Sequence, residues 1–486
     1  MRSKRFLLIL VLLFVWLAPA REAQAADEKH SIYEDLRFDV NGGTSRVVKT
    51  IHYKYENNRY LSMRDLAAAM SGTEKTFELA VADTSMTITT GIPYQAAGGE
   101  NEPFVIPEDV TDYAVTTRAL RLNTITIDER NVRYHTLIGK NGADINDCYM
   151  SLTDVAMMLD LDLTLDGQGL HLNTSGHFRM DMDVLKAQGF FYEVHSALVG
   201  DATTEEIYAS YEEDLSVPIA STTKLMTYLC VMDEIAAGKL TMDDTVIISK
   251  KAEKLSKSAD GTIVMTEGQE ATVRDLLYGL LLPSSNECAL ALAEHICGNE
   301  AAFVERMNDK ALEIGLSGDA VFYNSNGLPL FTDTVAASKI QNHMSAKDMF
   351  ILVSHILKEY PEIIEITDSV KTDLPSFGTS VSNTNPMIYN LPEAIGMKTG
   401  TTTMSGACLV SALEAEAPDG SKHYIVAVEF GAEDGTVRCT LSEELLLYGK
   451  QYLQDGNSGE AVVIPETGTG IPQNAEELIR AVLRNY

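Results

Sequence analysis

The chain has 486 residues, which is too many for one compact core, so we expect two or three domains. Its composition, 45% hydrophobic and 22% charged residues, is typical of a globular protein. The formal net charge of −32 argues against nucleic acid, which requires a basic face, and against electrostatic docking on anionic lipid. The histidines are scattered and the sequence has no C-x-x-C or H-E-x-x-H motif, so we expect neither a metal nor a cofactor.

Residues 1–25 predict an export signal. MRSKR is a basic n-region, FLLILVLLFVWLAPA is apolar but short for a membrane span, and AQA at 23–25 is a cleavage site; an uncleaved anchor is the alternative. We therefore expect a secreted, extracytoplasmic protein, in the cell wall or at the outer face of the cytoplasmic membrane. An exported chain with six cysteines can form disulfides, but most lie in apolar segments, which favours buried free thiols.

An internal repeat follows. RYLSMRDLAAAM at 59–70 matches CYMSLTDVAMML at 148–159, and each stretch predicts a short strand, a Ser-x-x-Asp helix cap and a helix. Strand-like alternation comes after each helix, at 77–81 and 161–165, and a second short strand comes next. The repeat predicts a small α+β module of two similar halves, joined by the Gly/Pro-rich loop GIPYQAAGGENEPFVIPED.

This module resembles the copper amine oxidase N-terminal-like domain, a stalk on bacterial surface proteins, over roughly residues 30–175. The sequence has no ligand cluster there that would indicate copper. The resemblance implies that residues 26–178 are a spacer, with a wall-binding or partner-binding role as the alternative.

The pattern changes at about residue 180. HSALVGDA and EEIYASYE predict a strand pair, and PIASTTKLMTYLCVMDEIAAG predicts a long helix that ends at Gly238. TVRDLLYGLLL and ECALALAEHICG predict two more helices, separated by PSSN. ACLVSALEAEA and HYIVAVEFGAE predict two late strands. Early and late strands with helices between them predict one sheet that pairs both ends of this domain.

Three short motifs lie in this region in a fixed order. They are Ser221-x-x-Lys224, Ser284-x-Asn286 and Lys398-Thr399-Gly400. S-x-x-K, S-x-N and K-T-G in this order are the signature of penicillin-binding proteins and class A β-lactamases. Taken one by one, the motifs also fit a helix N-cap, turn residues and a hairpin edge.

The S-x-x-K spacing carries a chemical argument. Positions i and i+3 share a helix face, so the Lys224 amine can reach the Ser221 hydroxyl. Serine is a poor nucleophile without a base, and a lysine becomes a base only when its pKa falls. Burial near a second cation, Lys398, would lower the pKa of Lys224. The motifs therefore predict acyl transfer through an activated serine.

Residues 180–450 resemble the serine-type D-Ala-D-Ala carboxypeptidases, which are low-molecular-mass penicillin-binding proteins, in the stretches PIASTTKLMT, LLYGLLLPSSNECALALA, FYNSNGLP, VSNTNPMI and GMKTGTTTMSGACLV. The resemblance implies an α+β fold of the penicillin-binding protein/β-lactamase type over residues 179–452, with an antiparallel sheet and a helical cluster. It also implies an enzyme that removes the terminal D-Ala from peptidoglycan stem pentapeptides and is acylated by β-lactams.

The resemblance implies a catalytic role for three side chains and two backbone groups. Ser221 is the nucleophile and Lys224 its base, while Ser284 relays a proton between Lys224 and the leaving group. The backbone N–H groups of Ser221 and Thr401 form the oxyanion hole.

The remaining motif residues are expected to bind substrate. Asn286 holds a backbone amide of the substrate, and Lys398 and Thr399 bind the terminal carboxylate of D-Ala-D-Ala or of a penicillin. Gly400 lets the strand backbone approach the substrate closely.

Two alternatives remain open. A β-lactamase shares the fold, but class A enzymes use a glutamate in an E-x-x-L-N stretch, and this stretch does not occur between 286 and 398. A non-catalytic wall or β-lactam receptor would not need the activated serine. Residues 453–486 predict a tail with a short amphipathic helix in NAEELIRAVLRNY, which could dock on its own domain or on a membrane surface.

Overall fold

The protein is described by a computed structural model, and the residues that it describes are 31–53, 59–82, 85–103, 118–119, 125–128, 130–132, 136–140, 146–166, 168–180, 182, 185, 193–331, 339–457 and 461–464. The predicted signal at 1–25 and the predicted tail helix at 474–486 lie outside these ranges. Within them, no helix is long and apolar enough to cross a membrane.

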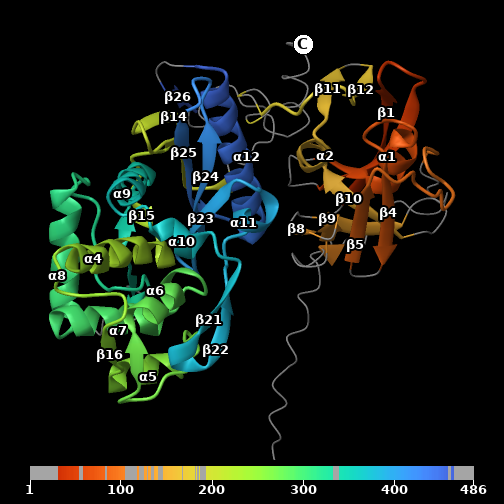
Figure 1. The fold of residues 1–486 in the computed structure, drawn as a ribbon. Helices are drawn as coiled ribbons and strands as arrows, with labels where there is room; N and C mark the ends of the chain where they lie inside the picture. Colours follow the sequence, from red (N-terminus) through yellow and green to blue (C-terminus); the bar gives the residue numbers. More distant parts are fainter. Residues whose placement is uncertain are drawn as a thin grey trace, which may run out of the picture.

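The described residues of the N-terminal part form strands and two short helices (Figure 1, red to yellow). These elements are β1 (Ser31–Val40), β2 (Arg46–Tyr53), β3 (Arg59–Ser62), α1 (Met63–Met70), β4 (Phe77–Ala82), β5 (Ser85–Thr90), β6 (Arg118–Ala119), β7 (Ile125–Ile127), β8 (Arg130–Val132), β9 (Thr136–Lys140), β10 (Asn146–Ser151), α2 (Leu152–Leu159), β11 (Asp162–Asp166) and β12 (Gly169–Asn173). One sheet has the order β11-β12-β1-β2-β3-β10-β9-β6, and a second sheet has the order β4-β5-β7-β8.

The internal repeat is visible as two equivalent strand–helix units. β3 and β10 pair antiparallel within the larger sheet, so the chain runs into α1 and into α2 from opposite directions. Ser62 and Ser151 cap the two helices, because their side-chain oxygens accept hydrogen bonds from the backbone N–H groups of Asp65 and Asp154. Both predicted caps are confirmed, and so are the predicted strands after the helices, β4 and β11.

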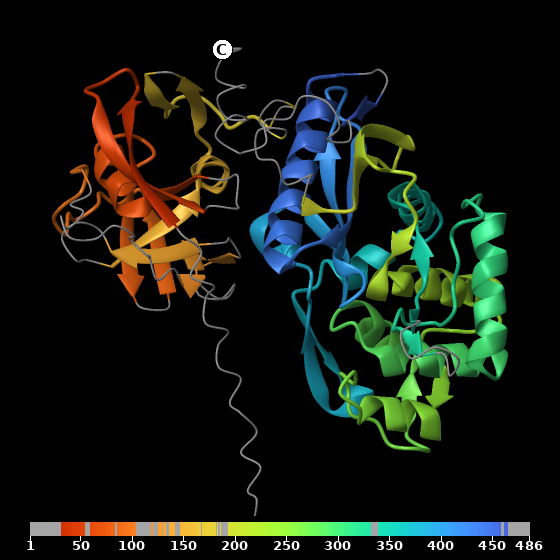
Figure 2. The ribbon, with the colours of Figure 1, turned by 180° about the vertical axis from the view of Figure 1, so that it is seen from behind.

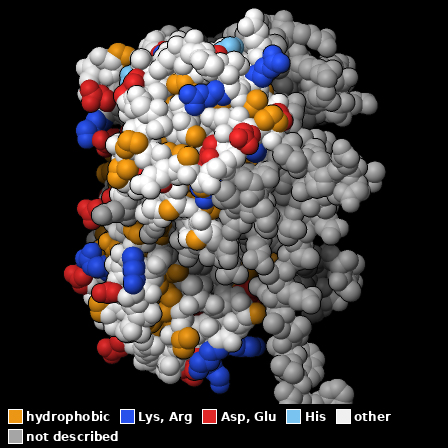
Figure 3. Space-filling view, turned by 90° about the vertical axis from the view of Figure 1, so that its right-hand side faces the viewer, with side chains coloured by type: hydrophobic (Ala, Val, Ile, Leu, Met, Phe, Trp, Pro, Cys, Tyr) orange, Lys and Arg blue, Asp and Glu red, His pale blue; other side chains and the backbone are white. Residues whose placement is uncertain are grey.

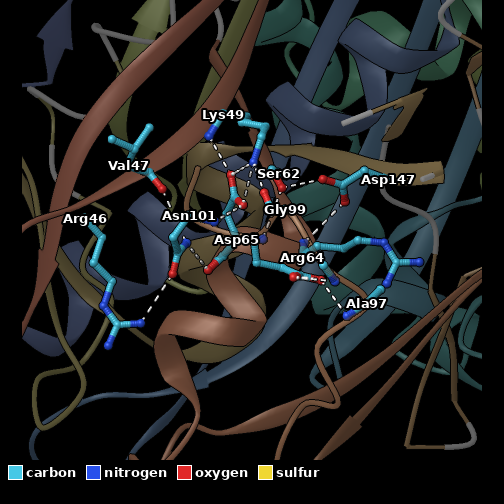
Figure 4. A network of polar contacts seen from close by, with 12 residues as sticks. Arg46, Val47, Lys49, Ser62, Arg64, Asp65, Ala97, Gly99, Asn101 and Asp147 are labelled. Atoms are coloured by element: carbon cyan, nitrogen blue, oxygen red, sulfur yellow. Dashed lines mark hydrogen bonds and ion pairs between the residues drawn. The ribbon is translucent and has the colours of Figure 1, made fainter. Parts of the chain in front are cut away.

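A buried polar network joins the first unit to the loop that follows β5 (Figure 4). Lys49 Nζ lies 3.1 Å from Asp65 Oδ1 and donates to the Gly99 carbonyl oxygen at 2.6 Å. Asp65 Oδ1 also accepts from the backbone N–H of Asn101 at 2.7 Å. Burial raises the pKa of Asp65, although the charge of Lys49 acts in the opposite direction. The described part of the predicted Gly/Pro-rich loop is therefore tied to α1 by specific bonds.

The C-terminal part of the chain contains a sheet of its own, called here the C-terminal sheet, and most of the described helices (Figure 1, Figure 2). Its strands are β13 (Ser196–Asp201), β14 (Glu206–Tyr211), β15 (Val217–Pro218), β16 (Thr245–Ile247), β17 (Glu270–Thr272), β18 (Leu330–Phe331), β19 (Lys339–Ile340), β20 (His343–Met344), β21 (Lys371–Leu374), β22 (Thr379–Ser382), β23 (Ala394–Thr402), β24 (Gly406–Glu416), β25 (Lys422–Ala432) and β26 (Val462–Val463). Its helical segments are η2 (Ala220–Thr223), α4 (Lys224–Ala236), α5 (Lys250–Ser256), α6 (Val273–Leu281), α7 (Asn286–Cys297), α8 (Glu300–Glu313), α9 (Ala346–Glu359), α10 (Ile363–Thr367), η3 (Pro375–Phe377), α11 (Met387–Asn390) and α12 (Gly435–Gln454).

This sheet has the order β23-β24-β25-β13-β14-β26, and the antiparallel pairing of β13 with β25 joins the early and late strands as predicted. Alternate residues of its strands pack on opposite faces. Leu198 and Val428 belong to the apolar cluster of the helical side, whereas Ala197 and Ala427 pack with Leu445 of α12. Burial on both faces explains the continuous apolar runs in these strands.

All six cysteines are free thiols, five of them buried, which confirms the preferred interpretation of the sequence. Burial raises the pKa of the Cys408 thiol to about 11 and that of Cys230 to about 12. Both thiols are therefore protonated at neutral pH and serve as small apolar side chains.

The N-terminal module touches the α12 side of the C-terminal sheet, which has the order β23-β24-β25-β13-β14-β26. Met157 of α2 packs against the apolar cluster that contains Leu445, and a cavity of about 360 Å³ lies between α2 and α12. The helices α4 and α7 lie on the other face of this sheet (Figure 1). The contact between the two parts is therefore remote from the helices that carry the first two motifs.

Candidate active site

Ser221 lies in a 3₁₀ turn that leads directly into a helix. Ala220 to Thr223 form η2, and α4 begins at Lys224. The N-cap residue of α4 is Thr223, so capping is not the role of Ser221. The Ser221 hydroxyl instead faces the next turn, where Lys224 Nζ lies 2.8 Å from its oxygen. The contact predicted from the S-x-x-K spacing is present in the fold.

Two glycines allow other segments to pack against the backbone of η2. A Cβ added to Gly400 of β23 would lie 2.9 Å from Ser221 N, and one added to Gly327 would lie 1.9 Å from the Ala220 carbonyl oxygen. Gly327 also has φ +88°, which disfavours any residue with a side chain. The sequence predicted that Gly400 lets the strand backbone approach the substrate, and the fold shows a second reason for a glycine here, its contact with the turn that carries Ser221.

Lys224 is fully buried and its ammonium group is surrounded by acceptors. Besides Ser221 Oγ, Nζ lies 2.8 Å from Asn286 Oδ1 and 2.8 Å from the Asn326 carbonyl oxygen. Burial lowers the pKa of Lys224 to about 7, and the negative charge of Glu287 acts in the opposite direction. A substantial fraction of the amine is therefore neutral near pH 7, as a general base requires.

The S-x-N motif occupies the predicted break between α6 and α7. Ser284 has φ +65°, an uncommon conformation for a residue with a side chain, and it is half-buried. Ser285 caps α7 by accepting from the backbone N–H of Cys288. Asn286 Oδ1 accepts from Lys224, and its Nδ2 donates to the Asp260 carbonyl oxygen at 2.8 Å. Asn286, predicted to hold substrate, thus also holds the lysine.

The K-T-G motif lies inside β23, and the strand predicted after it is β24. Lys398 is fully buried, and its Nζ donates to the Thr399 carbonyl oxygen at 2.8 Å. The hydroxyl oxygens of Thr399 and Thr384 lie 2.7 Å apart. Thr401 Oγ1 donates to the Gly400 carbonyl oxygen at 2.7 Å. The motif is therefore held by local bonds along one edge strand of the sheet.

Arg438 joins this strand from α12, and the sequence analysis did not identify it. Its Nη1 donates to Thr401 Oγ1 at 3.0 Å and to the Gly400 carbonyl oxygen at 3.3 Å. Burial lowers the pKa of Lys398, and the positive charges of Lys224 and Arg438 lower it further. Three basic side chains thus converge beside the turn that carries the serine, and of these Arg438 keeps its positive charge at neutral pH, which favours an anionic ligand.

Two further stretches that carry the family resemblance also contribute to the site, although the sequence predicted no role for their residues. FYNSNGLP supplies both the Asn326 carbonyl that Lys224 contacts and Gly327 beneath η2. VSNTNPMI supplies Thr384 beside Thr399. Their Asn- and Gly-rich composition could have indicated this contribution, because such residues form irregular loops whose backbone groups can bind side chains.

Known proteins resemble the region of the chain that contains the three motifs. The family profile described as D-alanyl-D-alanine carboxypeptidase matches residues 186–432. The chain is 33% identical over 244 residues to D-alanyl-D-alanine carboxypeptidase DacF of Bacillus subtilis, an alignment that covers 50% of this chain and 58% of that relative. It is 30% identical over 265 residues to D-alanyl-D-alanine carboxypeptidase DacD of Escherichia coli, which covers 53% and 64%.

The chain thus spans about three-fifths of the length of these curated relatives. Among solved structures, it is similar to a peptidoglycan synthesis regulatory factor from Streptococcus pneumoniae, with 28% identity, 53% of this chain and 71% of that chain covered, and a TM-score of 0.48.

Proposed function

Because the chain belongs to the D-alanyl-D-alanine carboxypeptidase family and has an α+β fold of the penicillin-binding protein type, we propose that it removes the terminal D-Ala from peptidoglycan stem pentapeptides through an acyl-enzyme on Ser221. The observation that carries this proposal is the 2.8 Å contact between the Ser221 hydroxyl and the buried amine of Lys224. A hydroxyl next to a lysine whose pKa is about 7 is an activated nucleophile.

In the first step, the neutral Lys224 amine accepts the Ser221 proton while Oγ attacks the carbonyl carbon of the penultimate D-Ala. The backbone N–H groups of Ser221 and Thr401 stabilise the oxyanion. Ser284 passes the proton from Lys224 to the leaving amine, the peptide bond breaks, and free D-Ala departs. Water then attacks the ester and restores Ser221, with Lys224 again accepting the proton.

Substrate recognition would use the cationic side of the site. A terminal carboxylate at the K-T-G strand meets the Thr399 hydroxyl and the positive charges of Lys398 and Arg438. β-Lactams carry a carboxylate in the same relation to a reactive carbonyl, so we expect them to acylate Ser221 as inhibitors. Asn286 would use its second Nδ2 hydrogen for the substrate backbone, because the first is bonded to Asp260.

A stem pentapeptide incubated with the enzyme should yield the tetrapeptide and free D-Ala as main products, as membership in the carboxypeptidase family implies. Mass spectrometry with and without an amine acceptor measures this. A predominantly cross-linked product, or no release of D-Ala by a folded enzyme that binds penicillin, would contradict a carboxypeptidase. Rapid penicillin hydrolysis would instead favour a β-lactamase, and no acylation at all would favour a receptor.

For the rest of the chain we propose the organisation predicted from the sequence: an export signal at 1–25, a stalk similar to copper amine oxidase N-terminal-like domains at 26–178, the catalytic domain at 179–452 and a tail at 453–486. This assigns the protein to the extracytoplasmic cell wall or membrane surface. On the face shown in Figure 3, basic and acidic side chains are interspersed with apolar ones. Mixed charge suits a solvated spacer better than a docking face for one charged polymer.

A chain that starts at residue 179 should fold and be acylated by penicillin at nearly the full-length rate. The physical reason is that the stalk meets the α12 side of the sheet, whereas Lys224 and Asn286 lie on α4 and α7 of the helical side. Rates of penicillin labelling for both chains provide the measurement. A folded short chain with a greatly reduced rate would show that the stalk completes the site.

A further inference from the structure

Glu287 follows the S-x-N motif directly, and the chemistry proposed above does not use it. It lies in the first turn of α7 and its exposed fraction is 0%. Its Oε1 accepts from the backbone N–H of Thr262 at 2.8 Å and from that of Ile263. Among the described residues, its Oε2 has no hydrogen-bond partner. A fully buried carboxylate with one unbonded oxygen is costly, so a function should compensate for it.

We propose that Glu287 is a positioning residue for acyl transfer, which orients Asn286 by holding residues 260–263 and places a negative charge beside Lys224. This inference rests on the proposed function of the same site. It concerns a side chain that neither touches the serine nor takes part in a bond-making step.

The first part of the inference concerns the amide of Asn286. Its Nδ2 donates to the carbonyl oxygen of Asp260, in the segment that Glu287 binds two residues further on. With Nδ2 fixed there, Oδ1 must point to the other side, where it accepts from Lys224 Nζ at 2.8 Å. If the segment moved, the amide could rotate and present N–H groups to the amine, which would remove an acceptor from the base.

The segment itself has little freedom while Glu287 holds it. A Cβ added to Gly261 would lie 2.1 Å from the Ser256 carbonyl oxygen, so the backbone rests directly on the end of α5. Ser256 Oγ also accepts from the backbone N–H of Met265 at 3.0 Å. These contacts make residues 260–263 a rigid support for Asn286.

The second part concerns charge. Burial lowers the pKa of Lys224, whereas the negative charge of Glu287 raises it. Lys398 and Arg438 are not among the charges that shift the pKa of Lys224. Glu287 therefore keeps the amine basic enough to take a proton from serine, despite its burial.

The substitution Glu287→Gln separates charge from structure, because the glutamine carbonyl still accepts from both backbone N–H groups. We expect the acidic limb of the pH profile for penicillin acylation of the full chain to shift to lower pH by roughly one unit, since Lys224 loses protons more easily without the neighbouring charge. The rate on the plateau should fall, because a less basic amine removes the serine proton less effectively. Second-order rates of labelling from pH 5 to pH 9 measure both effects.

Asp275→Asn is the matched control. Asp275 is a buried carboxylate on the neighbouring helix α6, and it accepts from the backbone N–H of Ser376 at 2.7 Å, but it is not among the charges that shift Lys224. Its substitution should leave the pH profile unchanged. Equal profiles for wild type and Glu287→Gln would overturn the charge role, and a wild-type plateau rate in a folded Glu287→Ala would overturn the orienting role.

A readout that does not depend on catalysis keeps this test separate from the proposed function. The Lys224 amine can be titrated by NMR with lysine carrying ¹³C at the ε position, with Lys224→Arg to assign the signal. A lower pKa of Lys224 in Glu287→Gln supports the inference even if wild type proves unreactive with penicillin, in which case only the proposed function fails. An unchanged pKa would overturn the charge role directly.

Discussion

Replacement of Ser221 by alanine is expected to abolish covalent labelling by a fluorescent penicillin. The hydroxyl oxygen forms the bond to the acyl group, so no slower route through the same residue remains. The fold should persist, because Ser221 does not cap α4 and its side chain contacts Lys224 rather than the apolar core. Gel fluorescence and intact-protein mass spectrometry provide the measurement.

Ser216→Ala is a suitable control for this experiment. Ser216 also precedes α4, but its hydroxyl donates to the Asp319 carbonyl oxygen and does not contact the site. This variant should be labelled like wild type. Labelling that survives in a folded Ser221→Ala protein would show that another residue is acylated, and the assignment of the nucleophile would then be wrong.

Lys224→Ala should lower the acylation rate by about 10²- to 10⁴-fold, the usual contribution of a positioned general base. The wild-type rate should rise with pH through about 7, because the ammonium form that predominates below the pKa of Lys224 cannot accept the serine proton. The variant should lose this dependence. Stopped-flow labelling across the same pH range measures both effects.

Lys224→Ala should also have two opposing effects on the melting temperature, because it removes the cost of burying an amine whose pKa falls to about 7 and it removes a buried hydrogen-bond donor. The substitution leaves Asn286 Oδ1 and the Asn326 carbonyl oxygen without their buried donor, at a cost of about 1–3 kcal/mol for each group that water does not reach. Lys224→Arg keeps a charge that cannot be lost in this pH range, so it should be as inactive as the alanine variant. Acylation of either variant at the wild-type rate would exclude Lys224 as the base.

Local sequence patterns predicted most of the elements that build the site. The stretches 218–238, 272–282 and 287–298 predicted three helices, and the fold contains them as α4, α6 and α7. The two Ser-x-x-Asp caps in the N-terminal repeat were also predicted correctly, because a cap depends on residues within one helical turn. The helix α12 was not predicted, although apolar residues recur along it.

The residue roles depend on contacts that no local pattern contains. Lys224 and Asn326 are 102 positions apart in the chain, and the low pKa of Lys224 results from burial by segments distant in sequence. Gly400 was predicted to let the strand backbone approach the substrate, and the fold adds a close contact of this glycine with the turn of Ser221. Arg438 gave no signal, because a single arginine in a helix is an ordinary surface residue until the fold places it beside Thr401.

Local spacing in the chain thus identifies the reactive groups and their order, because S-x-x-K, S-x-N and K-T-G are each complete within a few residues. It also determined that Ser221 and Lys224 meet, since one helical turn fixes that distance. The basicity of Lys224 and the orientation of Asn286 depend on the packing of the folded chain. The same packing brings the charges of Glu287 and Arg438 to the site. Burial and electrostatic interaction depend on distances through space, and packing of remote segments sets those distances.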